Sequence, residues 1–311
     1  MTPSLAVDLA PGHKTELLLR NPVMPASGTF SWGFEFAKHY DINRLGAVVS
    51  KGVTTHPRGG NAQPRVAETP MGMLNSIGLQ NVGLDKVIDE LAPQWERWET
   101  PVIVNLAADS PGEFGEMARA LDGVPGIAAL ELNISCPNVD GGMEIGQDPA
   151  AAAQATEAAV RSTELPVIVK LTPNVTDPVE TALACQDAGA AALCAINTVL
   201  GLAIDTEQRR PILPRARGGL SGPAIKPVAL RIVYDVAGAV DIPVIGCGGI
   251  RSGLDAVEFL MAGATAVQVG TATFANPRAL LDVIEELEAW MDAHGVADVR
   301  EIIGCARPLP A

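Results

Sequence analysis

The sequence predicts an α/β protein, a (β/α)8 TIM barrel with inserted active-site loops, and two observations predict it. Short apolar runs alternate with alanine-rich stretches of helical character, such as 149–163 and 177–190. This alternation is typical of βα units that build a parallel sheet through right-handed crossovers. The runs number eight and are evenly spread, which favours a closed barrel over the alternative, an open doubly wound sheet. The expected strands are 22–27, 46–51, 101–107, 129–135, 166–171, 192–197, 242–248 and 266–271.

The composition is that of a well-buried globular protein. Hydrophobic residues make up 48% of the 311 residues and charged residues only 19%. Because this length fits one barrel, we expect a single domain over residues 1–311. The formal net charge of −14 repels phosphate backbones and anionic membranes. We therefore expect neither nucleic acid nor a membrane as a partner.

The N-terminus and the cysteines indicate a cytoplasmic protein. Residues 1–14 lack the basic and apolar regions of a signal peptide, and no stretch reaches the ~18 uninterrupted apolar residues of a membrane span. The five cysteines are odd in number and show no C-x-x-C spacing, so we expect reduced thiols. No metal site, zinc or iron–sulfur, is expected from this chain alone.

Three segments depart from the repeat. Residues 52–80 form a long stretch rich in Gly, Pro and Asn, and residues 200–222 form another that carries four arginines. Loops of this length in a compact domain are usually lids or small insertions. Residues 1–20 are expected to form a short hairpin that caps the bottom of the barrel.

Small residues follow the last two expected strands. Gly248 and Gly249 end one strand, and Gly270 and Thr271 end the next, where backbone N–H groups can approach a phosphate. A dinucleotide fingerprint G-x-G-x-x-G is absent, because "GCGGIR" places Arg251 at the third glycine position. The pattern predicts a mononucleotide phosphate site rather than a dinucleotide site.

Polar side chains converge at the carboxyl ends of the other strands, where barrel active sites form. Two lysines, three asparagines and two hydroxyl residues stand there, and we expect no carboxylate among them. These residues are Ser27, Lys51, Asn105, Asn133, Lys170, Asn197 and Thr198.

This set of residue types points to a ring ligand and an anion. Asparagine offers both a donor and an acceptor, which match the edge of a pyrimidine or an isoalloxazine ring. One lysine near the pyrimidine end of a flavin would stabilise negative charge on the reduced ring, and the other could hold a substrate carboxylate. The alternative is a structural ion pair for each lysine, which the expected lack of carboxylates disfavours.

Cys136 stands just after the fourth expected strand, in the polar stretch "NISCPNV". A thiol there is compatible with a nucleophile, a metal ligand or a general base. No second thiol or histidine lies near it in sequence, which disfavours a metal. A thiol of pKa about 8.5 can take a moderately acidic C–H proton in a site that excludes water. The other cysteines, at 185, 194, 247 and 305, are expected to be small core residues.

Seven motifs, in order along nearly the whole chain, resemble dihydroorotate dehydrogenase of family 1. They are "SKGVTTHPRGGNAQPRVAETPMGMLNSIGLQN" (50–81), "NISCPNV" (133–139), "VKLTPNV" (169–175), "INT" (196–198), "GGLSGPAIKP" (218–227), "GCGGI" (246–250) and "VGTA" (269–272). The resemblance implies an FMN-dependent (β/α)8 barrel that oxidises dihydroorotate to orotate in pyrimidine synthesis.

The resemblance also implies a role for individual residues. Cys136 matches the catalytic cysteine, the base that removes the C5 proton while hydride leaves C6 for flavin N5, and Lys51 resembles a catalytic lysine shared by flavin and substrate. The implied substrate contacts are Lys51, Asn75, Ser76, Ile77, Gly78, Leu79, Asn133, Asn197 and Thr198. The implied flavin contacts are Ser27, Lys51, Gly52, Asn105, Asn133, Lys170, Ile196, Gly222, Gly248, Gly249, Gly270 and Thr271.

The stretch "PNVDGGMEIGQDP" (137–149) is similar to the class B pattern. That class implies a homodimer within a heterotetramer, in which a second subunit with FAD and a [2Fe–2S] cluster passes electrons to NAD. Class A enzymes, which use fumarate, are one alternative, and a dihydropyrimidine dehydrogenase-like enzyme acting on uracil or thymine is another. A flavin barrel that reduces tRNA uridines is disfavoured by the acidic charge, and a non-catalytic flavin module by Cys136.

Overall fold

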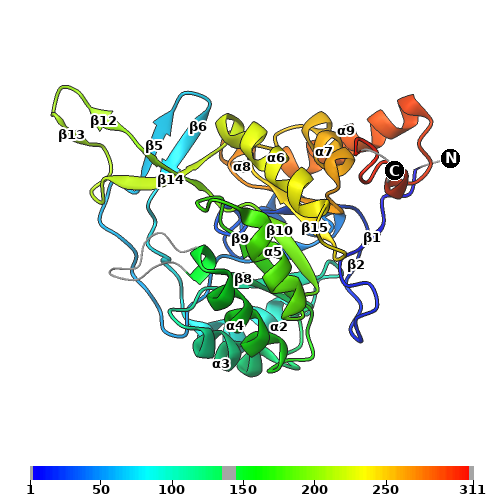
Figure 1. Ribbon diagram of the computed structural model, residues 1–311, viewed down its shortest axis with the longest axis horizontal. Coiled ribbons are helices and arrows are strands. Elements are labelled where there is room, and N and C mark those ends of the chain that lie inside the picture. The colour runs from blue at the N-terminus through cyan, green and yellow to red at the C-terminus, as the bar shows by residue number, and fades with distance from the viewer. Residues whose placement is uncertain (1–2, 135–144, 308–311) are drawn as a thin grey trace.

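Eight parallel strands form one barrel sheet in the computed structural model, which describes residues 3–134 and 145–307 (Figure 1). The order β3-β16-β15-β10-β9-β8-β7-β4 follows the chain around the barrel, and the Gly46 N–H donates to the Val23 carbonyl between the two end strands. The (β/α)8 prediction is confirmed, and the doubly wound alternative is wrong. The strands are β3 (Val23–Pro25), β4 (Val48–Val49), β7 (Val102–Leu106), β8 (Ala129–Asn133), β9 (Val167–Leu171), β10 (Ala192–Ala195), β15 (Val244–Cys247) and β16 (Ala266–Val269).

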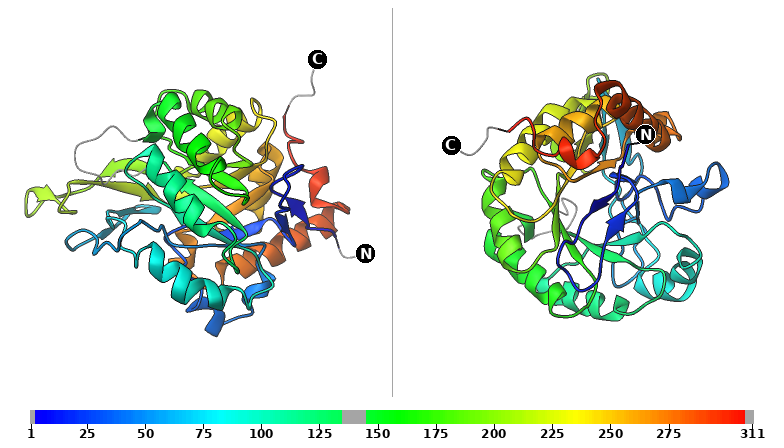
Figure 2. Two further views of the ribbon diagram at one scale, coloured as in Figure 1. Left: turned by 90° about the horizontal axis from the view of Figure 1, so that it is seen from below. Right: turned by 90° about the vertical axis from the view of Figure 1, so that its right-hand side faces the viewer.

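Helices surround the sheet as an outer ring (Figure 2). Several begin where the sequence supplies a cap: the side chains of Ser110, Asp148, Asp177 and Ser252 each accept a hydrogen bond from a backbone N–H of the first turn. The helices are α1 (Leu84–Lys86), η3 (Val87–Leu91), α2 (Ala92–Trp95), α3 (Pro111–Leu121), α4 (Pro149–Val160), α5 (Pro178–Asp187), α6 (Lys226–Ala237), α7 (Gly253–Ala262), α8 (Ala272–Ala275) and α9 (Ala279–His294). Shorter turns are η1 (Phe36–Lys38), η2 (Ile42–Arg44), η4 (Ile145–Gln147), η5 (Pro223–Ile225) and η6 (Val299–Glu301).

The core lies inside the sheet and between the sheet and its helices. All five residues of β7 and all five of β9 are buried, as expected for strands covered on both faces. No helix within residues 3–134 and 145–307 is long and apolar enough to cross a membrane.

The N-terminal hairpin lies at the bottom of the barrel, as predicted. β1 (Val7–Asp8) pairs antiparallel with β2 (Leu18–Leu19). The Thr15 hydroxyl donates to the carbonyl of Glu164, which precedes β9 at its amino end. Figure 2 shows the hairpin crossing the barrel end, far from the long insertions.

The two long insertions are more ordered than the sequence predicts. They contribute β5 (Val66–Thr69), β6 (Gly72–Asn75), β11 (Val199–Leu202) and β14 (Arg217–Ser221) to one antiparallel sheet in the order β11-β14-β6-β5. A further hairpin, β12 (Ile204–Asp205) with β13 (Arg210–Pro211), extends beyond it. Figure 1 shows these strands projecting from the barrel end opposite β1 and β2. The strands are short and glycine-rich, and they form by pairing between distant segments, which no local pattern reveals.

Candidate active site

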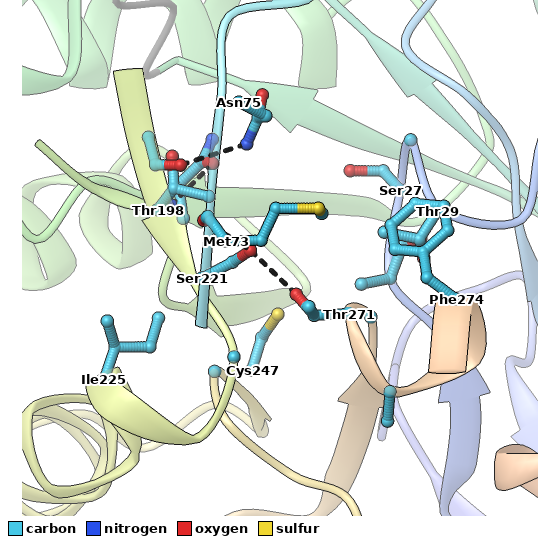
Figure 3. Close-up of a pocket in the computed structure, with 18 of the residues that line it drawn as sticks. Ser27, Thr29, Met73, Asn75, Thr198, Ser221, Ile225, Cys247, Thr271 and Phe274 are labelled. Atoms are coloured by element: carbon cyan, nitrogen blue, oxygen red, sulfur yellow. Dashed lines mark hydrogen bonds between the residues drawn. The ribbon is translucent and has the colours of Figure 1, made fainter. Parts of the chain in front are cut away.

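A cavity of about 550 Å³ opens at the carboxyl ends of the barrel strands, beneath the inserted sheet (Figure 3). This volume lies within the range of about 300–1,000 Å³ that is usual for small-molecule sites. Most of the residues predicted for the site line it. They are Ser27, Lys51, Gly52, Asn75, Ile77, Gly78, Leu79, Asn105, Asn133, Lys170, Ile196, Asn197, Thr198, Gly222, Gly248, Gly249, Gly270 and Thr271.

Two predicted residues stand apart from that set. Ser76 is buried but does not line the cavity, and its hydroxyl accepts a hydrogen bond from Asn61 Nδ2 at 3.1 Å. Its place in the chain brings Asn75 and Ile77 to the cavity wall on either side. Cys136 lies outside the described residues, and the structure therefore leaves its role a prediction.

Lys51 supplies the cavity with a positive charge that no carboxylate offsets within residues 3–134 and 145–307. It follows β4, and within the described part of the chain it forms no ion pair. Burial, and then the nearby Arg65 guanidinium, lower the pKa of Lys51 below its ordinary value. A half-buried cation without a carboxylate partner among the described residues favours an anionic ligand.

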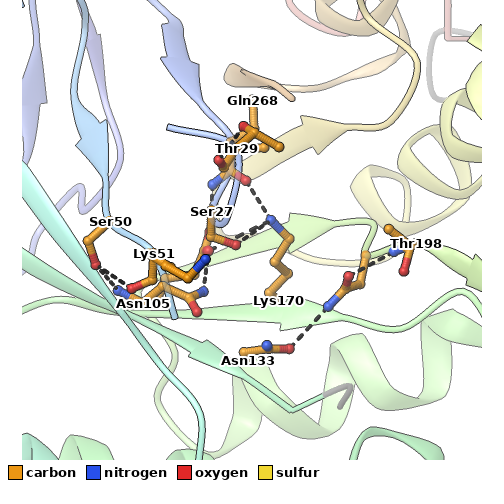
Figure 4. A network of polar contacts seen from close by, with 12 residues as sticks. Ser27, Thr29, Ser50, Lys51, Asn105, Asn133, Lys170, Thr198 and Gln268 are labelled. Carbon is orange, nitrogen blue, oxygen red and sulfur yellow. Dashed lines mark hydrogen bonds and ion pairs between the residues drawn. The ribbon is translucent and has the colours of Figure 1, made fainter. Parts of the chain in front are cut away.

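Lys170 is paired, contrary to the expectation that no carboxylate reaches the strand ends. Its Nζ lies 3.7 Å from Glu131 Oε1 and donates to Gln268 Oε1 at 2.7 Å (Figure 4). Glu131 occupies β8 two residues before Asn133, so both side chains point to the same face of the strand. Burial alone would lower the pKa of Lys170, but its neighbours Cys194, Cys247 and Glu131 raise it. Lys170 is therefore a buried ammonium with a compensating carboxylate.

Asn105 offers an unsatisfied acceptor at the cavity wall. Its Nδ2 donates to Glu131 Oε1 at 2.7 Å, while its buried Oδ1 has no partner among the described residues. Because unpaired buried polar atoms are rare, a ligand N–H is the natural donor for this oxygen.

The remaining amides are held in place by one another. Asn197 Nδ2 donates to Asn133 Oδ1 at 3.1 Å, and Asn197 Oδ1 accepts the backbone N–H of Thr198 at 2.8 Å (Figure 4). Asn75 Nδ2 donates to the Gly219 carbonyl, which ties the 75–79 loop to the inserted sheet. The amides thus come from strands and insertions that are distant in sequence, as the motifs predict.

The glycine turn after β15 has the left-handed backbone that a close ligand approach favours. Gly249 has φ +81°, and a Cβ there would lie 2.6–2.8 Å from Cβ, Cα and N of Lys226. Thr271 donates its hydroxyl hydrogen to Ser221 Oγ at 2.7 Å, which joins this side of the cavity to β14 (Figure 3). The turns after β15 and β16 border the cavity without side chains that would fill it.

Some cavity residues were not predicted from the sequence. Ser221 and Met73 lie in quoted motifs (218–227 and 50–81), which were the only signal for them, whereas Phe274 had none. Phe274 is 58% exposed at the cavity, in the short helix α8.

The core prediction is confirmed for Cys185, Cys194 and Cys247, which are buried in the core cluster, and is wrong for Cys305, which is exposed. Cys247 also borders the cavity. Cys247 faces inward because it is in register with Gln268, which binds Lys170 inside the barrel. A hydrogen bond with Cys194, and then the charge of Lys170, lower the pKa of Cys247 to about 7.

Comparison with known proteins settles the family. A family model described as dihydroorotate dehydrogenase matches residues 13–291. The chain belongs to the dihydroorotate dehydrogenase family. It is 53% identical over 305 residues to the "Dihydroorotate dehydrogenase B (NAD(+)), catalytic subunit" of Trichlorobacter lovleyi, covering 98% of this chain and 99% of that protein. Proteins of the same name from Pelobacter propionicus (54% over 305 residues, 98% and 99% covered) and Geotalea uraniireducens (55% over 303 residues, 97% and 98% covered) are similarly close.

Membership in the dihydroorotate dehydrogenase family implies a flavin, and the residues fit one. The orphaned Asn105 Oδ1 suits a ring N–H, and the buried Lys170 ammonium suits an electron-rich ring edge. The glycine turns on the other side leave room for a phosphate. The cavity therefore has complementary groups for both ends of a flavin mononucleotide.

Proposed function

We propose that the chain is the catalytic subunit of an NAD-linked dihydroorotate dehydrogenase. It oxidises (S)-dihydroorotate to orotate in the de novo synthesis of pyrimidines (UMP). Residues 1–311 form a single FMN-binding barrel domain, and the protein works in the cytoplasm. The names of its close relatives and the residues of the cavity both support this assignment.

The observation that carries the proposal is the charge of Lys51, which no carboxylate in the described part of the chain compensates. The carboxylate of dihydroorotate distinguishes this substrate from uracil and thymine, and an unpaired lysine is the group that binds it. Asn75, Asn133 and Asn197 surround the same space with the amide donors and acceptors that the pyrimidine ring needs. Ile77, Gly78, Leu79 and Thr198 complete the substrate contacts, with Ser76 supporting their loop from behind.

The reaction removes a proton from C5 and a hydride from C6, which leaves the C5–C6 double bond of orotate. Bound FMN supplies the hydride acceptor, its N5 atom. Cys136, which lies outside the described residues, is the proposed base for the C5 proton. Lys51 fixes the substrate by its carboxylate, so that C5 and C6 are held in one orientation.

The cofactor contacts proposed for this chain divide between the ring and the phosphate. The ring is held by residues at the strand ends, and the phosphate by backbone N–H groups of the glycine turns. The ring contacts are Ser27, Lys51, Gly52, Asn105, Asn133, Lys170 and Ile196. The phosphate contacts are Gly222, Gly248, Gly249, Gly270 and Thr271.

We propose that electrons leave through a second subunit. That subunit carries FAD and a [2Fe–2S] cluster and reduces NAD, and the assembly is a heterotetramer built on a homodimer of this chain. The absence of a dinucleotide fingerprint in the sequence supports this division of labour.

A ligand panel tests the proposal. The purified, FMN-loaded chain is titrated with orotate, uracil and thymine while the flavin absorbance is recorded. We expect a spectral shift with orotate at concentrations where uracil and thymine give none. Preference for uracil would favour the dihydropyrimidine dehydrogenase-like alternative. Rapid reoxidation of the reduced chain by fumarate, rather than by NAD with a partner subunit, would favour the class A alternative.

A further inference from the structure

A buried carboxylate lies just beneath the floor of the cavity. Glu131 of β8 is 0% exposed and does not line the cavity. It accepts a hydrogen bond from Asn105 Nδ2 at 2.7 Å and one from Gln268 Nε2 at 2.5 Å, and its Oε1 lies 3.7 Å from Lys170 Nζ. Three residues from three other strands thus converge on one carboxylate.

Glu131 determines the orientation of the side-chain amides of Asn105 and Gln268. An ionised carboxylate accepts hydrogen bonds and donates none, so the NH2 groups of Asn105 and Gln268 must point to it. Gln268 is then left with Oε1 toward Lys170, and this oxygen accepts from Nζ at 2.7 Å. Asn105 is left with Oδ1 away from Glu131, and this is the oxygen without a partner among the described residues. Glu131 thus sets which atoms at the cavity floor donate and which accept hydrogen bonds.

Glu131 also offsets the charge of Lys170. Lys170 is only 4% exposed, and a buried ammonium without a counter-charge is strongly unfavourable. Within the described residues, Glu131 is the one carboxylate within 4 Å of its Nζ. The floor thus holds a neutral pair, in contrast to Lys51 on the cavity wall.

We propose that Glu131 is a positioning residue that sets the hydrogen-bonding polarity of the cavity floor and tunes the reduction potential of the flavin. It fixes Asn105 Oδ1 as an acceptor and Lys170 as a donor for the ring, and it moderates the positive field that Lys170 exerts there. The inference rests on the proposed binding of FMN.

The test is Glu131→Gln, which keeps the shape but can donate as well as accept. Both amides are then free to turn, and Lys170 loses its counter-charge. We expect the dissociation constant of FMN to rise roughly tenfold or more, as for the loss of a charge-assisted hydrogen bond. We also expect the flavin midpoint potential to become more positive, because the uncompensated ammonium favours the reduced, more negative ring. A merely structural role would lower stability and leave the potential unchanged.

Further variants serve as a control and as a second test of the role of Glu131. Glu113→Gln removes a carboxylate of α3 that accepts from the Thr55 hydroxyl and does not line the cavity, and it should change neither FMN affinity nor potential. If Glu131→Gln does not fold, Lys170→Met is compared with the double variant Glu131→Gln/Lys170→Met. The double variant should then have the more positive potential of the two.

Two results would overturn the inference. A folded Glu131→Gln protein with wild-type FMN affinity and potential, or equal potentials in Lys170→Met and the double variant, would refute the role of Glu131 while leaving the proposed cofactor intact. Failure of the wild-type chain to bind FMN would refute both.

Discussion

The charge of Lys51, which forms no ion pair with the described residues, leads to the prediction that can be worked furthest from the structure. Lys51→Met keeps an unbranched side chain, one atom shorter, and removes the ammonium. A hydrogen bond between charged groups in a half-buried site contributes about 1.5–3 kcal/mol, which corresponds to about a 10- to 100-fold loss of orotate affinity. The assay is a titration of the FMN-loaded protein with orotate, followed by flavin absorbance. Lys86→Met is the matched control, because Lys86 is exposed in α1 and outside the cavity.

The same variant should not weaken the fold. Burial, with Arg65, lowers the pKa of Lys51 in the folded protein, so the unfolded chain binds its proton more tightly. Lys51 therefore opposes folding below its folded pKa, and this effect fades as pH rises toward the ordinary lysine value. We expect Lys51→Met apoprotein to melt at the wild-type temperature or above it. Wild-type orotate affinity in Lys51→Met, or a clear loss of stability, would refute the reasoning.

Three further predictions concern Asp255 of α7 and two residues of the cavity, Gly249 and Cys247. Burial opposes ionisation of Asp255, but hydrogen bonds from Lys226 and two backbone N–H groups lower its pKa. Its contribution to stability is therefore present at neutral pH and lost as pH falls through the folded pKa. Asp255→Asn should lower the free energy of unfolding in urea by about 1–3 kcal/mol at pH 7 and by much less in acid. Gly249→Ala places a Cβ against the Lys226 backbone at positive φ, a strain of about 1–2 kcal/mol that should weaken FMN binding about tenfold by fluorescence titration, and wild-type affinity would contradict it. Cys247, with its pKa lowered to about 7, should be alkylated by iodoacetamide in the apoprotein and protected by FMN, as peptide mass spectrometry would show; equal labelling with and without FMN would argue against its place at the cavity.

The barrel was predictable because each of its strands is an apolar run between turns. The residues at the ends of those runs converge by geometry alone, since parallel strands present their carboxyl ends at one edge. For this reason the sequence alone was enough to group Lys51, Asn105 and Lys170, and all three line the cavity.

The features that the sequence analysis missed depend on residues beneath the cavity surface or on contacts between segments that are far apart in sequence. Glu131 was overlooked because it stands inside the run "ALELNIS", although it shares a face with Asn133 in an alternating strand. Cys247 belongs to the core as predicted, but its register with Gln268 also brings it to the cavity, which its apolar neighbours in sequence do not reveal. The inserted sheet could not be foreseen, because β6 pairs with β14 from the other, distant insertion.

The measurement that tests the central claim most directly is an anaerobic titration of the purified, FMN-loaded chain with dihydroorotate, with Cys136→Ala as the comparison. We predict that the flavin absorbance of the wild type bleaches promptly. In the variant, bleaching should slow by about 10²- to 10⁴-fold, the usual contribution of a general base, while orotate still binds. Bound flavin that dihydroorotate leaves oxidised, but that dihydrouracil reduces, would contradict the account.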